Sequence, residues 1–150
     1  MDDLWERIRR DRVEAMKARD QERVEILRYL EAQLKNRSIE LGGSLPGEEA
    51  EAVLQREAKR RREAIAGFAG RPGAEAFVEQ QRRELAVIEG YLPAPLAPEE
   101  LERMVEEAVA EAGASGPRDV GRVMALLMPR LRGRADGAEV SRRVRERLGG

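Results

Sequence analysis

The sequence predicts an all-α protein on three observations. Charged residues make up 38% of the chain and aromatic residues only 3%, while Ala, Leu, Glu and Arg dominate, and this mixture favours helix. Apolar residues recur at three- and four-residue steps, the period of an amphipathic helix. Glycine and proline clusters divide this pattern into segments. We therefore expect seven helices, four in an N-terminal part and three in a smaller C-terminal cluster.

Four helices are expected in the N-terminal part. Asp3 with Glu6 resembles a capping box for the first helix, and Asp20 is placed to cap the second. The third helix follows the turn cluster GGSLPG, and the fourth follows the break AGRPG. Trp5 is expected to pack between helices. The predicted apolar stripes are Leu4, Ile8 and Met16; Val24, Leu27, Leu30, Leu34 and Leu41; Ile65 and Phe68; and Val78, Leu85, Ile88 and Leu92.

The segment YLPAPLAPEE, with prolines at 93, 95 and 98, is the best domain boundary in the chain. A residue that precedes proline is disfavoured in helix, so the fourth helix should end near Leu92. We expect an N-terminal helical domain over residues 1–92 and a C-terminal three-helix domain over residues 93–150.

The C-terminal domain is organised around SGPRDVGRVMALLMPRLRGRADG, residues 115–137. A helix ending at Gly113 should precede this stretch, and a helix capped by Asp136 should follow it. Pro129 is expected to kink or tighten the middle helix near its end. The predicted stripes are Leu101, Val105 and Val109; Val120, Val123, Met124, Leu127, Met128 and Leu131; and Val140, Val144 and Leu148.

The composition excludes several kinds of chemistry. The chain has neither histidine nor cysteine, so it offers no imidazole acid or base, no thiol nucleophile and no zinc site of the usual kind. No apolar run approaches membrane-spanning length, and the charged start MDDLWERIRR is not a signal peptide. We therefore expect a soluble cytoplasmic protein with no membrane partner, no metal and no cofactor.

Catalysis is not expected either. Carboxylates occur on polar helix faces with arginines nearby, the usual pattern of exposed ion pairs. Ser115 and Ser141 have no base near them in the sequence, and the glycines match neither a phosphate-binding loop nor a dinucleotide fingerprint. We predict a protein that is not an enzyme and has no small-molecule substrate.

Charge is distributed unevenly although the net charge is −1. Six acidic residues lie between Glu99 and Glu111, opposed only by Arg103. From Ser115 onward nine arginines outnumber four acidic residues, a balance of +5. By contrast, the four basic side chains of Lys59–Arg62 point about 100° apart around a helix and cannot form one patch. We therefore expect most of them to be solvated, with the aliphatic part of one lying along the core, and prefer this interpretation to a nucleic-acid site.

Three stretches in order along the chain resemble the GatB/YqeY family: LQREAKRRREAI at 54–65, LAVIEGYLPAPL at 85–96 and MALLMPRLRGRADG at 124–137. Members of that family are small helical proteins similar to the tail domain of the B subunit of the tRNA-dependent amidotransferase. The resemblance implies tRNA as a partner, with an amidotransferase or an aminoacyl-tRNA synthetase as the enzyme involved.

Two hypotheses for function follow. The first is a non-catalytic tRNA-binding accessory module that reads shape, because aromatic residues for base stacking are few. The alternative is a helical protein–protein interaction adaptor without direct RNA binding. The arginines of the tail either contact phosphates or cap helix carbonyls and pair with the preceding acidic helix. The candidate tRNA-binding residues are Arg122, Arg130, Arg132, Gly133, Arg134 and Arg143.

Overall fold

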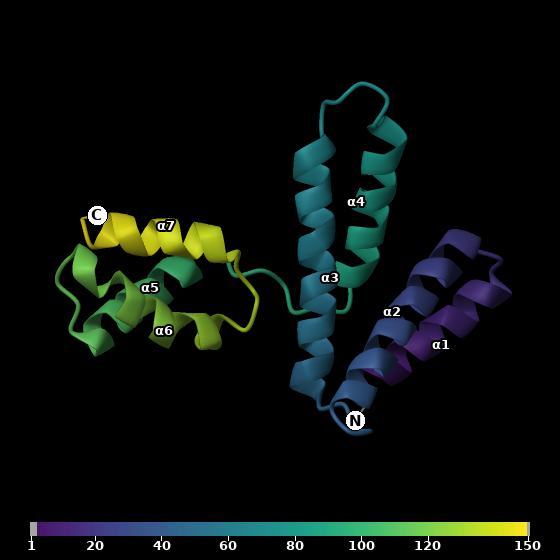
Figure 1. Ribbon diagram of the computed structural model, residues 1–150, viewed down its shortest axis with the longest axis horizontal. Helices are drawn as coiled ribbons and strands as arrows, with labels where there is room; N and C mark the ends of the chain where they lie inside the picture. The colour runs from purple at the N-terminus through teal and green to yellow at the C-terminus, as the bar shows by residue number, and fades with distance from the viewer. Residues whose placement is uncertain (1–2, 150) are drawn as a thin grey trace. The chain divides into compact units, whose positions relative to one another are not determined.

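The computed structural model describes residues 3–149, and the chain forms two compact units, Met1–Pro93 and Ala94–Gly150 (Figure 1). The described residues form seven α-helices and one short 3-10 helix, with no strand among them. The all-α prediction is confirmed, and four helices precede the proline-rich segment while three follow it. Nowhere in residues 3–149 is a helix both long and apolar enough to cross a bilayer.

Two helical hairpins build the N-terminal unit, α1 with α2 and α3 with α4 (Figure 1). The helices span Leu4–Lys17 (α1), Gln21–Glu40 (α2), Gly47–Phe68 (α3) and Glu75–Glu89 (α4). As predicted, Asp3 accepts a hydrogen bond from the Glu6 amide at 2.8 Å, and Asp20 accepts one from the Arg23 amide at 3.2 Å. Such caps each contribute about 1 kcal/mol to helix stability.

The core of this unit is aliphatic. Trp5 packs partly buried against it, as expected. Three residues of the predicted stripes, Met16, Leu41 and Phe68, are instead 40–47% exposed. Each lies within one residue of a helix end. The largest fully buried side chains are Ile8, Leu27, Leu30, Leu34, Leu54 and Ile88.

One side chain of the basic run on α3 is buried. Arg61 is 9% exposed and pairs with Glu57 at 2.8 Å and with Glu84 of α4 at 3.0 Å. Its guanidinium carbon lies 5.4 Å from the centre of the Tyr29 ring. The neighbouring Arg62 is half-exposed and pairs with Glu89. The four basic side chains therefore point in different directions, as their helical spacing predicts, and form no single patch.

The C-terminal unit consists of α5 (Pro98–Ala112), a 3-10 turn (Pro117–Asp119), α6 (Val120–Leu131) and α7 (Gly137–Arg147). Gly113 ends α5 in the left-handed region with φ 64°, and Asp136 caps α7 through the Glu139 amide. The 3-10 turn directly precedes α6, which therefore begins at Val120. The helix then continues through Pro129 to Leu131.

The core of this unit includes most of the predicted α6 stripe. Val123, Leu127 and Leu131 are fully buried, and Val120 and Met124 pack partly buried around them. The prediction that Met128 is buried is wrong, because its side chain is 37% exposed. Met128 follows Leu127 and so points about 100° away from the centre of the buried face.

Candidate nucleic-acid interface

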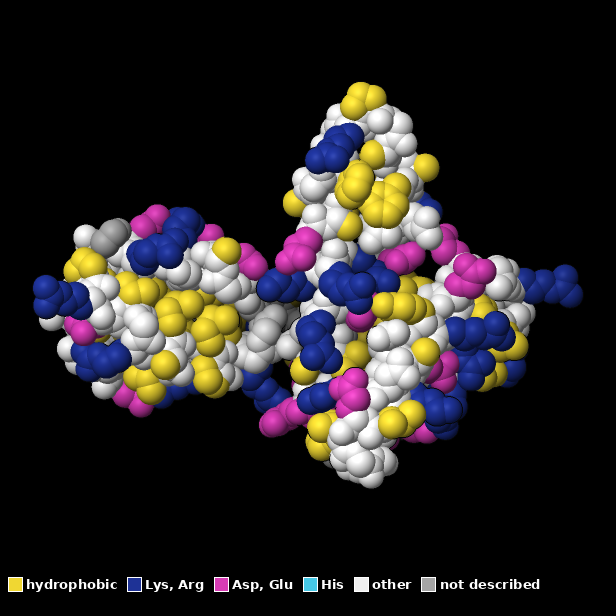
Figure 2. All heavy atoms as spheres, in the orientation of Figure 1, with side chains coloured by type: hydrophobic (Ala, Val, Ile, Leu, Met, Phe, Trp, Pro, Cys, Tyr) yellow, Lys and Arg dark blue, Asp and Glu magenta, His cyan; other side chains and the backbone are white. Residues whose placement is uncertain are grey.

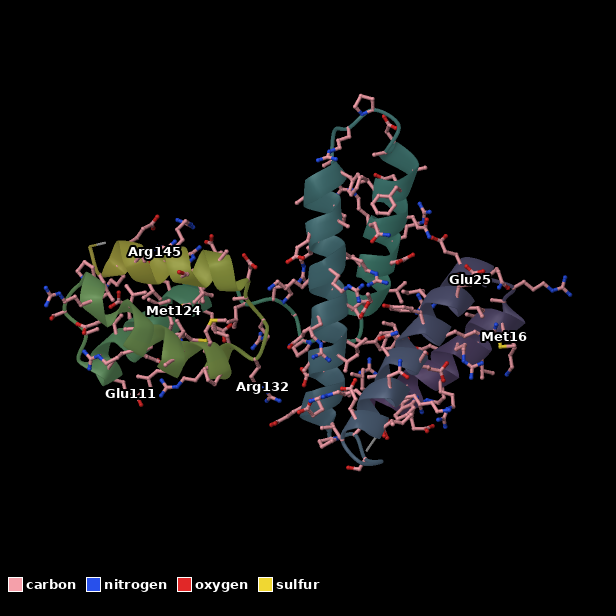
Figure 3. The ribbon with its side chains drawn as sticks, viewed as in Figure 1. Met16, Glu25, Glu111, Met124, Arg132 and Arg145 are labelled. Atoms are coloured by element: carbon pink, nitrogen blue, oxygen red, sulfur yellow. The ribbon has the colours of Figure 1, made fainter. Side chains whose placement is uncertain are left out.

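Three of the candidate arginines lie where α6 ends, in residues 130–134, which we call the arginine-rich turn. Arg132 has φ 51° and ψ 38°, and Gly133 has φ 75°, so two consecutive residues adopt left-handed conformations. Arg132 is exposed, and it extends outward from the turn in Figure 3. Glycine tolerates such a φ without cost, whereas a residue with a Cβ pays roughly 1–2 kcal/mol. The turn reverses the chain between α6 and α7 and presents the Arg132 side chain to solvent.

Arg130 lies on the last turn of α6 and pairs with α5. Its Nη2 lies 2.7 Å from the Oε2 of Glu111, and both side chains are more than a third exposed. Solvent-exposed ion pairs of this kind contribute about 0–1 kcal/mol. Arg130 is therefore held near the turn by a weak contact that a phosphate can replace.

Arg134 has a structural contact on the other side of the turn. Its Nε donates to the Ala94 carbonyl at 2.8 Å, and its own carbonyl accepts from the Leu96 amide at 3.0 Å. These two bonds fix the first residues of the C-terminal unit against the α6–α7 connection. The guanidinium carries five N–H donors, and the bond to Ala94 uses one of them.

Arg122 closes the far end of α5. It donates to the Ala112 carbonyl at 3.0 Å and pairs with Asp119 at 2.6 Å. A cation at a helix C-terminus satisfies orphan carbonyls and interacts favourably with the helix dipole. This arrangement lies at the α5–α6 connection, at the opposite end of α6 from the arginine-rich turn.

Arg143 lies between two carboxylates, one on its own helix and one on α5. Its Nε lies 2.9 Å from Glu139 one turn earlier on α7, and its Nη1 lies 3.8 Å from Glu102 of α5. Three-quarters of its side chain is buried. The structure thus brings Arg130, Arg132, Gly133 and Arg134 together at one turn and places Arg122 and Arg143 apart from it.

The acidic face of α5 meets the basic helices of the same unit. Glu111 pairs with Arg130 of α6, and Glu102 with Arg143 of α7. Glu106 similarly forms an ion pair with Arg147. Over residues 94–150 ten arginines balance ten acidic residues. The charge that is polarised along the sequence is therefore largely neutralised by folding.

Two carboxylates of this unit have clearly lowered pKa values. The Asp119 pKa is lowered chiefly by a hydrogen bond from the Ser115 amide and then by Arg122. The Glu139 pKa is lowered chiefly by Arg142, with a further contribution from Arg143. Both groups are thus held ionised, the opposite of the raised pKa that a carboxylic acid needs to donate protons at neutral pH.

An exposed pair of phenylalanines was not predicted from the sequence. Phe68 and Phe77, the two phenylalanines of the chain, lie together at the exposed tip of the α3–α4 hairpin, with ring centroids 5.1 Å apart. The signal was available, because both residues flank the same glycine-containing loop, AGRPG. Within residues 3–149 no cluster of three or more acidic side chains is arranged to hold a metal ion.

Comparison with family models identifies the chain. A model described as Yqey-like protein matches residues 5–148, nearly the whole length. The chain belongs to the YqeY-like family. This family is not known as a catalytic one. A comparison with curated proteins found no match. The resemblance drawn from the three sequence stretches is thereby confirmed for the family.

Proposed function

We propose that this YqeY-like protein is a non-catalytic, tRNA-binding accessory module that contacts the RNA backbone through the arginine-rich turn after α6. The observation that carries the proposal is the grouping of Arg130, Arg132 and Arg134 around Gly133 on a left-handed turn. Guanidinium groups are suited to phosphate because they remain charged and donate in a planar fork. The proposal places the protein in the cytoplasm, where it would accompany an amidotransferase or an aminoacyl-tRNA synthetase.

The roles of the arginines differ within this proposal. Arg130 exchanges its exposed contact with Glu111 for a phosphate, and Arg132 approaches the backbone from the turn itself. Arg134 holds the turn through Ala94 and offers its remaining donors. Arg122 and Arg143 support the helices that carry the turn. Because the arginines and acidic residues of the C-terminal unit balance, the unit has no general attraction for RNA and binds only through the arginine-rich turn. We therefore expect a small number of phosphate contacts.

A salt series of tRNA gel shifts tests the proposal. Replacing Arg130, Arg132 and Arg134 by glutamine should weaken binding of all tRNA species alike, because phosphate contacts carry no sequence information. The slope of log affinity against log salt should fall by up to ~0.9 per lost contact, and so by about two to three in total. Because Arg134 also bonds to Ala94, a second variant keeps Arg134 and replaces only Arg130 and Arg132, with an expected loss near two.

The control is a triple glutamine variant in the N-terminal unit with the same change in net charge. Its three arginines are each about half-exposed and ion-paired, as Arg130 is. We expect it to retain most of the wild-type salt slope. Equal losses in both triple variants, or no loss in a folded Arg130/Arg132 variant, would remove the turn from the interface. The control residues are Arg9, Arg62 and Arg83.

One observation favours the second candidate function, an adaptor that binds another protein. Met128 is 37% exposed beside the partly buried Met124 on α6. Methionine is flexible and common at adaptable binding surfaces. Wild-type protein that binds no tRNA at low salt, but binds a partner protein with an affinity that Met128→Lys abolishes, would favour this function instead.

A further inference from the structure

The tip of the α3–α4 hairpin carries an exposed aromatic pair. Phe68 is the last residue of α3, and Phe77 lies in the first turn of α4. Their rings meet edge to face at an interplanar angle of 66°, and each residue is 41% exposed. Figure 2 shows hydrophobic side chains gathered on this part of the surface. The rings are thus packed on each other and still open to solvent.

The phenylalanine pair lies on the same face of the hairpin that α2 covers further from the tip. Arg61 and Glu84 pair across α3 and α4 at 3.0 Å, and Tyr29 of α2 lies against Arg61. Phe68 follows Arg61 by seven residues, and Phe77 precedes Glu84 by seven. Two helical turns therefore place the phenylalanines on the same faces, about 10 Å further along the hairpin. The covered face continues as an open aromatic surface.

A cation completes this surface. The guanidinium carbon of Arg71 lies 5.0 Å from the centre of the Phe68 ring, and Arg71 belongs to the loop that joins the helices. An open hollow of about 390 Å³ lies here, near the lower end of the range of small-ligand sites. Arg71 is the charged residue of its lining, which consists of Phe68, Arg71, Pro72, Gly73, Ala74 and Phe77.

We propose that this hollow binds one unstacked base of a single-stranded RNA segment, with the base against the phenylalanine rings and an adjoining phosphate at Arg71. The proposal rests on the RNA-binding function proposed above and adds a second contact site to it. Unstacked RNA bases stack on aromatic rings and guanidinium planes, and such stacking tolerates any base. The size of the hollow also favours a base over a protein partner. Six residues line the hollow, whereas a stable protein interface involves about 20–30 residues on each side.

The neighbouring hollow fits this occupant less well. It shares Phe68 and Arg71, but it is also lined by Glu75 and Glu79, and Arg82 pairs with Glu79 at 3.6 Å. Carboxylates repel an RNA backbone. The base therefore belongs on the side bounded by the loop and both rings.

A single-stranded RNA hexanucleotide with one 2-aminopurine tests the site without depending on tRNA. Binding in the hollow takes the 2-aminopurine out of its stack with neighbouring bases, so its fluorescence should change when wild-type protein is added at low salt. Replacing Phe68 and Phe77 together by leucine keeps an apolar surface but removes the aromatic faces. Binding should weaken about tenfold, within the range expected for loss of base stacking. Replacing both by tyrosine retains the rings and should retain the binding affinity.

Three further results decide the outcome. Arg71→Gln should weaken binding and reduce its salt dependence, whereas Ile39→Ala, an exposed apolar change on α2, should do neither. Absence of a fluorescence change with the wild type, or equal binding by the leucine and wild-type proteins, overturns the proposal. If the wild type forms dimers that the leucine variant loses, while probe binding is unchanged, the tip binds a second copy and the proposal is overturned. Because tRNA binding by the α6–α7 turn is measured separately, a failure at either site is distinguishable from a failure at the other.

Discussion

Arg130 of α6 and Glu111 of α5 form an ion pair with an N–O distance of 2.7 Å. Under the proposed function, the same arginine has two alternative partners, the carboxylate of its own unit and a phosphate of the RNA. In the proposed tRNA complex, Glu111 would therefore compete with RNA for Arg130. This competition makes the acidic residue a sharper test of the proposed interface than the arginine itself.

Glu111→Gln should tighten tRNA binding severalfold at low salt. The substitution releases Arg130 and removes a negative charge beside the proposed phosphate position. Glu107→Gln changes the net charge equally, but Glu107 pairs with Arg103 on the same helix and should have less effect. Filter binding of one tRNA to both variants measures the difference. Equal affinities would mean that Arg130 takes no part in binding.

Leu127→Ala should destabilise the protein by about 2–5 kcal/mol, because Leu127 is fully buried in the C-terminal core. Met128→Ala, one residue further along α6, should cost less than about 1 kcal/mol, since surface substitutions have small effects. Urea denaturation of both variants provides the comparison. A loss below about half a kcal/mol for Leu127→Ala would contradict the packing described for α6.

Arg61→Met should cost about 3–5 kcal/mol, because it leaves the buried Glu57 without its main partner. Arg62→Met removes a half-exposed pair with Glu89 and should cost about 1 kcal/mol or less. Thermal and urea unfolding of these adjacent substitutions separate a buried charge from an exposed one. Similar losses would indicate that Arg61 is solvated in solution.

Gly113→Ala should destabilise the C-terminal unit by roughly 1–2 kcal/mol, since Gly113 has φ 64°. Gly121→Ala is the matched control, because Gly121 lies inside α6 with open space around its Cα. That substitution should stabilise the protein by about 0.4–1 kcal/mol through the unfolded chain. Relative to the wild type, the denaturation midpoint should fall for Gly113→Ala and rise for Gly121→Ala.

Alkaline titration should show both tyrosines ionising above their ordinary pKa. Burial, followed by a hydrogen bond to Asp11, raises the Tyr91 pKa, and burial with Glu57 raises that of Tyr29. The neutral phenols therefore stabilise the fold below the unfolded pKa near 10, and this contribution is lost as pH rises through the folded values. Tyrosinate absorbance in native protein, compared with protein in concentrated guanidinium chloride, measures the shift. Coincident curves would contradict it.

Local signals explain what the sequence predicted well. The caps at Asp3, Asp20 and Asp136 and the stop at Gly113 depend only on neighbouring residues, so the helices and their order followed from the sequence. Burial at the stripe edges did not, because exposure of Met128 depends on which turn of a neighbouring helix lies beside it.

The candidate site was predicted as a set of residues but not as an arrangement. Residues 130–134 form one turn because they are close in sequence. Contacts of Arg122 with Ala112 and of Arg134 with Ala94 depend on how distant segments pack. The contact between Phe68 and Phe77 was not predicted either, because they belong to different helices and meet only when these helices pack.

The seven-residue spacing that links the Arg61–Glu84 pair to the Phe68–Phe77 pair makes the α3–α4 hairpin modular in length. Removing seven residues from each helix beyond the ion pair would shorten the hairpin by two turns while rotating the tip by only about 20°. Such a truncated protein should keep its aliphatic core and the connecting loop, and lose the Phe68–Phe77 pair. During evolution the tip can therefore lengthen, shorten or change its residues without altering the rest of the unit.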